Sequence, residues 1–265
     1  MSVGVALAAI LGLAFAAYFP LLGLDHLGWD TWPLLVSARV ASFGDLAASF
    51  TEVLMDGRYP HGDFYRPVLS LSVGFDGVFW GLRPFGYHLT DLLLLLLTCL
   101  AAFAAGRRLL GDPWAAVAAC ALFALHPLHF ESLPVTARRG DALAGLFTLL
   151  ALVCLPPRGQ GRGLGATLFA VLAVGSKETG LLAAPLLVVL AFVEGEGSPA
   201  RRWRDALRVA APALVALAVF LLLRLWVLGG LGGHGGSSLV AGALRAPLLG
   251  LDHLGWDTWP LLVSA

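Results

Sequence analysis

The chain has 265 residues, of which 58% are hydrophobic and only 13% are charged, and its mean hydropathy is +0.84. Soluble domains carry about a quarter charged residues, so this composition excludes an ordinary soluble domain and predicts a membrane protein with several spans. The 17 basic and 17 acidic residues cancel, which removes the bulk positive charge expected of a nucleic-acid-binding protein. The three cysteines, Cys99, Cys120 and Cys154, lie in apolar runs, which favours packing roles over a disulfide framework or a metal site.

Apolar runs of about 20 residues are long enough to cross the hydrocarbon core of a bilayer as helices. By this measure, the sequence predicts seven membrane spans. They cover roughly residues 3–24, 87–106, 113–130, 141–156, 164–176, 179–194 and 207–228. A signal peptide is the alternative for the first run, since AFAA offers a cleavage site, but its length and the lack of a preceding Lys or Arg favour a span.

Arginine residues gather in three short loops that alternate along the chain. These residues are Arg107, Arg108, Arg158, Arg162, Arg201, Arg202, Arg204 and Arg208. The positive-inside rule predicts that the three loops are cytoplasmic. Residues 25–86, the turns that follow the third and fifth spans, and the tail from Gly229 then face the other side of the membrane.

The long loop 25–86 is predicted to be partly helical. Residues 33–54 and 66–82 carry apolar residues at helical spacing, in the manner of helices that lie at a membrane surface. Residues 55–67 are rich in Gly, Pro and aromatic residues and predict an ordered turn. The expected fold is therefore an all-α polytopic membrane protein with about seven transmembrane helices and a large first outer loop that contains juxtamembrane helices.

Ionisable residues concentrate at the outer ends of the predicted spans, where a charge is costly enough to indicate a functional site. Asp25, His26 and Asp30 follow the first span, and Asp30 lies between Trp29 and Trp32. An aromatic belt with a helix cap is the structural alternative, because Asp and Thr before a proline also begin a helix well. Two carboxylates and a histidine within six residues favour the functional interpretation.

A second group, HPLHFES, lies at the outer end of the third span. His126, His129 and Glu131 could hold zinc, but Pro127 disturbs the helical spacing that such a site prefers. The sequence requires no cofactor, and it does not decide whether the protein needs a divalent metal. Alternatively, the two histidines cap the helix and bond to the backbone. Glu131 is harder to explain structurally, since an unpaired carboxylate at the membrane boundary costs free energy.

Arg138, Arg139 and Lys177 lie in outer loops that the positive-inside rule should deplete of cations. An anionic ligand explains them, and guanidinium and ammonium groups suit phosphate, which at a membrane boundary would belong to a lipid. The structural alternative is pairing within the chain, of Arg139 with Asp141 or of Lys177 with Glu178. The supporting candidates, in chain order, are Arg66, His88, His126, His129, Asp141 and Glu178.

Five segments, in this order, carry a family resemblance: DHLGWDTWPLL, FYRPVLSLS, GLRPFGYHLTDLLLL, ALFALHPLHFESLPVTARRGDALAGLFTLLAL and GSKETGLLAAPLLVVL. The pattern resembles the N-terminal half of the GT-C membrane glycosyltransferases, most closely the branch of the protein O-mannosyltransferases, those with tetratricopeptide repeats, and their bacterial relatives. The resemblance covers about residues 1–240. Because the chain shows no tetratricopeptide repeats and fewer spans than family members usually carry, we expect residues 1–247 to be a truncated catalytic region.

The resemblance implies a sugar donor carried on a polyprenyl phosphate, an acceptor hydroxyl on a protein or glycan, and inversion at the anomeric carbon. It also implies a bacterial plasma-membrane enzyme with its site on the non-cytoplasmic side. The family's general base matches Asp30, with Asp25 as the second choice, and Glu131 matches an acidic position after the third span. The positions where the family presents cations to the lipid phosphate match Arg138, Arg139 and Lys177. General-base catalysis and stabilisation of the leaving phosphate suit these residue types.

A transporter or flippase for a lipid-linked or anionic solute is the alternative function. Such a protein should show inverted repeats, broken helices and charges near the middle of the membrane. The predicted spans instead carry their charges at the ends, apart from Arg224, whose side chain can snorkel. This pattern favours an enzyme over a transporter, and both over an inert membrane anchor.

Residues 248–265 repeat residues 21–38 without a single difference, and Pro247 matches Pro20. A duplicate that had diverged would show substitutions at interchangeable Leu and Val positions. A repeat architecture is also excluded, because a single short copy has no neighbouring repeats to pack against. We therefore expect a join artefact in the nucleotide sequence or a recent duplication, and we assign no site to Asp252 or Asp257.

Overall fold

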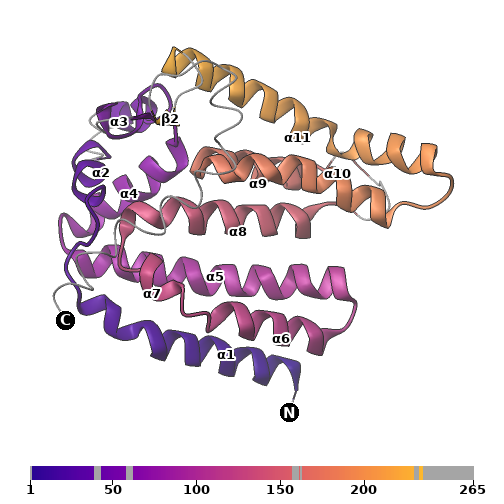
Figure 1. The fold of residues 1–265 in the computed structure, drawn as a ribbon, viewed down its shortest axis with the longest axis horizontal. Helices are drawn as coiled ribbons and strands as arrows, with labels where there is room; N and C mark the ends of the chain where they lie inside the picture. Colours follow the sequence, from indigo (N-terminus) through magenta and orange to yellow (C-terminus); the bar gives the residue numbers. More distant parts are fainter. Residues whose placement is uncertain are drawn as a thin grey trace.

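The computed structural model describes residues 2–38, 43–57, 62–156, 161, 163–229 and 233–234. The second copy of the repeat, residues 248–265, lies outside these described residues, as do Arg158 and Arg162. The described chain is almost entirely helical, and its long helices lie side by side with short helices gathered at one end (Figure 1). One two-residue pair, β1 (Gly62–Asp63) with β2 (Gly233–His234), is antiparallel.

The first half of the chain contains two long helices, Val3–Tyr18 and Pro84–Leu110, and several shorter ones. Its elements are α1 (Val3–Tyr18), η1 (Phe19–Gly23), α2 (Thr31–Ser37), α3 (Phe43–Ala48), η2 (Leu54–Gly57), α4 (Pro67–Trp80), α5 (Pro84–Leu110) and α6 (Pro113–Ala124). The second half alternates short and long helices. Its elements are α7 (His129–Ser132), η3 (Thr136–Arg138), α8 (Arg139–Cys154), α9 (Leu164–Ser176), η5 (Glu178–Leu182), α10 (Ala183–Glu194) and α11 (Pro199–Leu228).

Local sequence signals set the ends of the long helices. Helices α5 and α6 both begin with a proline in the first turn, and Asp112 caps α6 by accepting hydrogen bonds from the backbone amides of Trp114 and Ala115. A proline loses nothing there, because the first amides of a helix have no partner inside it. Gly111 ends α5 with φ +72°, a left-handed conformation that favours glycine.

Each predicted span corresponds to a described helix. The first span is α1 with η1, the sixth is η5 with α10, and the seventh is the later part of α11. Within the part of the chain that the structure describes, three helices are able to cross a membrane by length and composition: Val3–Gly23, Pro84–Leu110 and Pro199–Leu228. The number of spans therefore stays a prediction. The two predicted juxtamembrane segments correspond to α2 with α3 and to α4.

Successive long helices run in alternating directions, so that their connections fall at opposite ends of the bundle (Figure 1). The short helices α2, α3, α4 and α7 lie at one end, which we call the α4 end. The other end, which we call the Arg108 end, carries the end of α5 and the α10–α11 connection. The arginine-rich segments at 107–108 and 201–208 both lie there.

Two cores hold the long helices together. Alanines form much of the first core, between α8, α9, α10 and α11, and they let the helix backbones approach closely. The close approach is visible at Gly180, where an added Cβ would lie 2.2 Å from the carbonyl oxygen of Ala173. The second core joins α1, α5 and α6.

Arg108, in the last turn of α5, ties three helices together at the Arg108 end. Its guanidinium pairs with Glu194 at 2.6 Å, and it also donates hydrogen bonds to the carbonyls of Leu152, Val153 and Leu155 at 2.7, 3.1 and 2.6 Å. The last carbonyls of a helix have no partner inside it, so Arg108 satisfies the end of α8 while it binds the end of α10.

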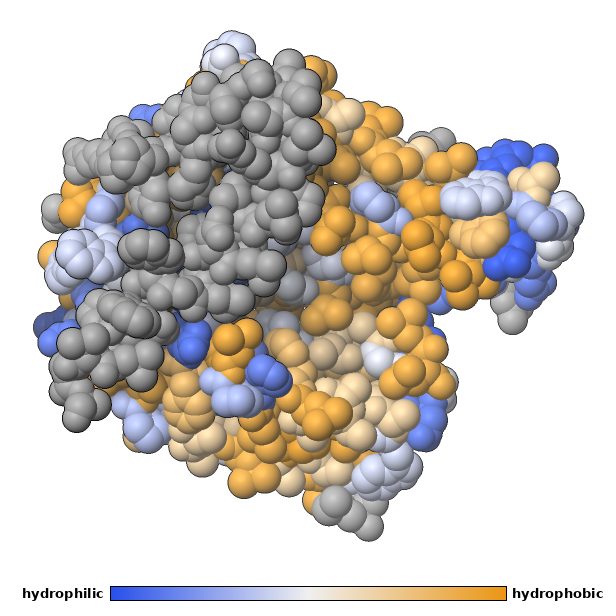
Figure 2. All heavy atoms as spheres, in the orientation of Figure 1, coloured by the Kyte–Doolittle hydropathy of each residue, from blue (hydrophilic) through white to orange (hydrophobic). Residues whose placement is uncertain are grey.

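The surface of the long helices is extensively apolar (Figure 2). Exposed large side chains include Leu122, Leu164, Leu222 and Trp226, which come from three helices, α6, α9 and α11. Hydrophilic residues gather instead at the tip where α10 gives way to α11. A soluble monomer rarely exposes apolar patches of this extent, and the surface agrees with the composition in identifying a membrane protein.

Candidate functional site

The first outer segment places Asp25 and Asp30 in different settings. Asp30 occupies the N-cap position of α2, but its side chain makes no capping hydrogen bond. It is half-buried between Trp29 and Trp32, which are 82% and 51% exposed. The Asp25 side chain is exposed, whereas its backbone carbonyl accepts a hydrogen bond from Nε2 of the buried His88 at 3.3 Å. The geometry therefore does not support a simple capping role for the Asp30 carboxylate.

His26 links this segment to α5. Its Nε2 donates to the Leu82 carbonyl at 3.2 Å, and its ring lies 5.2 Å from Trp32, 5.2 Å from Tyr87 and 6.2 Å from His88, between ring centroids. Burial lowers the pKa of His26 below its ordinary value. A neutral ring fits this largely aromatic setting.

The two histidines after α6 bond to the backbone. His129 Nε2 donates to the Phe123 carbonyl at 2.8 Å, and His126 Nδ1 accepts from the Leu128 amide at 3.3 Å. This is the structural alternative considered for the pair. Within the described residues, no group of three His, Cys, Asp or Glu side chains is placed to hold a metal ion.

Glu131 has a cationic partner in the same loop. Its Oε2 lies 3.9 Å from Nη1 of Arg138, at the limit of an ion pair, and the two side chains are 42% and 19% exposed. The Glu131 carboxylate is exposed, whereas the Arg138 side chain is partly buried.

The first outer segment and the loop after α6 pack against each other. Gly28 has φ +90°, and an added Cβ there would lie 2.7 Å from Cγ1 of Val135. Helix α2 also contacts η3, which contains Arg138. The elements that carry Asp30 and Arg138 are therefore neighbours, as expected if both serve one site.

Arg139 is not exposed to a ligand, although the sequence made it a phosphate-binding candidate. Its side chain is fully buried, with Nη2 2.7 Å from Asp76 Oδ2 and Nε bonded to Asp91. It also donates to the carbonyls of Ser72 and Tyr87 at 3.2 and 3.1 Å. Arg139 thus pairs within the chain, but with Asp76 and Asp91 and not with the expected Asp141.

Sequence reasoning missed Asp76 and Asp91. Each is the single carboxylate of a largely apolar helix, and the two residues are 6% and 5% exposed respectively. Such a residue needs a buried cationic partner, and this rule could have flagged both. Thr90 supports the network by donating to Asp76 at 2.7 Å.

Lys177 and Glu178 are adjacent in sequence but pair with different residues. Lys177 Nζ lies 2.6 Å from Asp141 Oδ2, whereas Glu178 lies 2.7 Å from Arg66 and 2.9 Å from Arg224. The expected Lys177–Glu178 pair is therefore replaced. Burial would raise the pKa of Glu178, but the attraction of the two arginines outweighs it and lowers that pKa to about 2.

The starting turn of α8 brings these pairs close to one another. An added Cβ on Gly140 would lie 3.0 Å from the Ser176 carbonyl oxygen and 3.7 Å from Cβ of Lys177. The elements that carry the predicted site residues all lie at the α4 end (Figure 1). Arg139 and the Arg66–Glu178–Arg224 group supply rigid support there, while Asp30, Asp25, Glu131, Arg138 and Lys177 remain at least partly exposed.

Comparison with known proteins gives a consistent set of relatives. Over 234 residues, 82% of this chain, it is 30% identical to the protein O-mannosyl-transferase Tmtc2 of Drosophila melanogaster. It is 35% identical to TMTC2 of Homo sapiens over 102 residues, which is 38% of this chain. It is 28% identical to Tmtc1 of Drosophila melanogaster over 185 residues, which is 67% of this chain. No family model and no solved structure matches the chain.

The matched regions are 24%, 12% and 21% of these relatives' own lengths, so the chain spans at most about a quarter of the curated relatives it matches. All three carry the name protein O-mannosyl-transferase. The family resemblance predicted from the ordered motifs is confirmed: this chain is a homologue of the protein O-mannosyl-transferases.

Proposed function

We propose that this chain is the membrane-embedded catalytic region of an inverting glycosyltransferase. It transfers a sugar from a polyprenyl-phosphate donor to a hydroxyl of a protein or glycan acceptor on the non-cytoplasmic side. The observation that carries the proposal is the similarity to protein O-mannosyl-transferases over 82% of the chain. The contact between the acidic first outer segment and the Arg138 loop supports a site at the α4 end.

Asp30 is the proposed general base. Its carboxylate accepts the proton of the acceptor hydroxyl as the acceptor oxygen bonds to the anomeric carbon, while the bond from that carbon to the phosphate oxygen breaks. The polyprenyl phosphate leaves with the bonding electrons, and attack from the opposite face inverts the configuration. Such proton transfer contributes roughly a hundred- to ten-thousand-fold to the rate. Asp25 is the second choice, supported by the backbone hydrogen bond from His88.

Arg138 and Lys177 are the proposed phosphate ligands. Their side chains are 19% and 25% exposed, and carboxylates lie beside both of them, Glu131 near Arg138 and Asp141 at Lys177. A lipid phosphate would take the place of these carboxylates in charge-assisted hydrogen bonds, and the two cations would stabilise the negative charge of the leaving phosphate. Arg139 takes a positioning role, because its buried pairs hold α4 and α5 against the start of α8.

We propose that the seven predicted spans all cross a bacterial plasma membrane, with the Arg108 end in the cytoplasm. The arginines of that end support this orientation through the positive-inside rule. The alternating directions of the helices fit it as well (Figure 1). A transporter or flippase is disfavoured, since four of the described ion pairs, Arg66–Glu178, Arg108–Glu194, Glu131–Arg138 and Lys177–Asp141, lie near helix ends.

Donor binding tests the proposal without requiring the remainder of a longer enzyme. The chain, purified in detergent, should bind mannosyl polyprenyl phosphate, and Arg138→Ala and Lys177→Ala should each weaken binding by about tenfold or more. Arg107→Ala is the matched control, because that exposed arginine lies at the Arg108 end. Equal donor affinity in all four proteins would contradict the phosphate assignment.

A further inference from the structure

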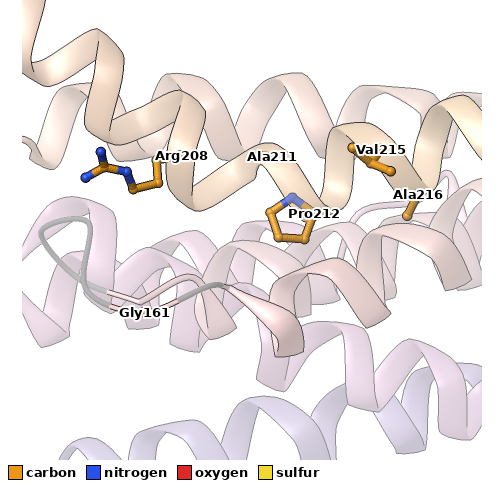
Figure 3. Close-up of a pocket in the computed structure, with 6 residues that line it drawn as sticks. All are labelled: Gly161, Arg208, Ala211, Pro212, Val215 and Ala216. Atoms are coloured by element: carbon orange, nitrogen blue, oxygen red, sulfur yellow. The ribbon is translucent and has the colours of Figure 1, made fainter.

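A groove runs along one face of α11 near the Arg108 end, away from the candidate site. It has a volume of about 750 Å³, and it is lined by Arg208, Ala211, Pro212, Val215 and Ala216 of α11 together with Gly161 (Figure 3). The five α11 residues recur at helical spacings of three and four, so they share one face of the helix. The groove is apolar except at Arg208, which lies at one end of it.

Pro212 gives this groove a second polar feature. Proline has no amide hydrogen, so the carbonyl of Arg208, four residues earlier, lacks its usual helical donor. Residues i and i−4 lie one above the other on a helix, which places this carbonyl on the groove face. In the hydrocarbon region, where water is absent, a carbonyl that lacks its helical donor needs another one. It therefore favours a ligand that brings a hydrogen-bond donor.

Arg208 also provides a cation at the same point. Its side chain is 71% exposed and reaches Asp205 only at 3.8 Å, a weak surface contact. A guanidinium binds a phosphate through paired N–H donors. One residue thus offers a cationic donor from its side chain and an acceptor from its backbone, at the head of an apolar groove.

We propose that this groove binds a phospholipid whose head group carries a primary ammonium, as in phosphatidylethanolamine. The phosphate accepts hydrogen bonds from the Arg208 guanidinium, and the ammonium donates to the Arg208 carbonyl. An acyl chain lies along Ala211, Pro212, Val215 and Ala216. Phosphatidylcholine has the same net charge as phosphatidylethanolamine, but its quaternary ammonium has no N–H donor. Its phosphate can bind the Arg208 guanidinium, whereas its head group cannot donate to the Arg208 carbonyl. The site is independent of the proposed transferase activity, because it lies toward the opposite end of the bundle.

Native mass spectrometry of the purified chain, titrated with palmitoyl-oleoyl phosphatidylethanolamine or the matching phosphatidylcholine, measures the preference directly. The wild-type chain should retain the ethanolamine lipid about tenfold more strongly, the effect of one charge-assisted hydrogen bond at a partly solvated site. Pro212→Ala restores the amide donor to the Arg208 carbonyl, so the ratio between the two lipids should fall close to one while both still bind.

Arg208→Gln separates the second contact. This variant should weaken both lipids by about tenfold and keep the preference for ethanolamine, because the carbonyl is unchanged. Arg107→Gln, an exposed arginine outside the groove, should alter neither value. Equal retention of the two lipids by the wild type, or an unchanged ratio in Pro212→Ala, would overturn the proposal. Stronger retention of phosphatidylglycerol than of the ethanolamine lipid would likewise overturn it, by showing attraction to net charge alone.

Discussion

Replacement of the buried Arg139 tests the network at the start of α8. Arg139→Met removes the one cation that both Asp76 and Asp91 contact, and the three side chains are 0%, 9% and 6% exposed. Breaking a buried ion pair by removing one partner costs about 3–5 kcal/mol, because the remaining charge is left without compensation. For a chain of this size, each kcal/mol corresponds to about 2–4 °C in the unfolding midpoint. We expect a midpoint at least about 6 °C lower, measured by thermal unfolding in detergent.

Two further variants make this prediction specific. Arg138→Met, at the neighbouring residue, removes a partly exposed cation whose contact with Glu131 is 3.9 Å long and should cost less than Arg139→Met, because no buried carboxylate depends on that contact. The triple variant Arg139→Met, Asp76→Asn, Asp91→Asn leaves no buried charge in the group and should regain most of the lost stability. Equal midpoints for Arg139→Met and Arg138→Met, or a triple variant no more stable than the single one, would refute the reasoning.

Three other predictions concern catalysis, pH dependence and orientation. Asp30→Asn in a longer homologous enzyme should lower turnover by about a hundredfold or more with donor affinity nearly unchanged, and an inactive Asp25→Asn beside a normal Asp30→Asn would reverse the assignment. The folded-state pKa of Glu178, about 2, lies below its ordinary 4.5, so its stabilising pairs act fully above about pH 4.5 and are lost as the pH falls toward 2. Unfolding midpoints of the wild type should therefore fall over this range, and those of Glu178→Gln should fall less; parallel curves would contradict this. Cysteines introduced at Asp112 and at Asp25 should react with impermeant reagents from opposite sides of the membrane, and labelling from one side would disprove the proposed alternation.

The helices could be predicted because length and hydropathy alone set most of them. The main error was the third span, predicted to residue 130, whereas α6 ends at Ala124. Pro127 explains the difference, since a residue before proline avoids the helical region and proline itself cannot donate to the preceding turn. The chain instead turns tightly there, with the His126 amide bonded to the Phe123 carbonyl.

The candidate site residues could be proposed from the sequence because charges are conspicuous in an apolar chain, and their role in a site stays a prediction, whereas their ion-pair partners could not be predicted. The expected pairs were neighbours in sequence, and residues one or two apart do not face each other on a helix. The observed partners are 36 residues apart for Lys177 and Asp141, and 112 apart for Arg66 and Glu178. Such pairs depend on how α4, α9 and α11 pack, which local sequence does not determine.

The position of Arg108 has a consequence for the order of events during synthesis. Its carbonyl partners follow it by 44 to 47 residues, and Glu194 follows it by 86. At about 5–20 residues per second, the ribosome needs roughly 4 to 17 seconds to supply Glu194. In the orientation proposed above, the guanidinium is during that interval a hydrated charge that opposes translocation of its loop. Afterwards it becomes a link between α5, α8 and α10, so the same side chain first orients the nascent chain and then locks the finished bundle.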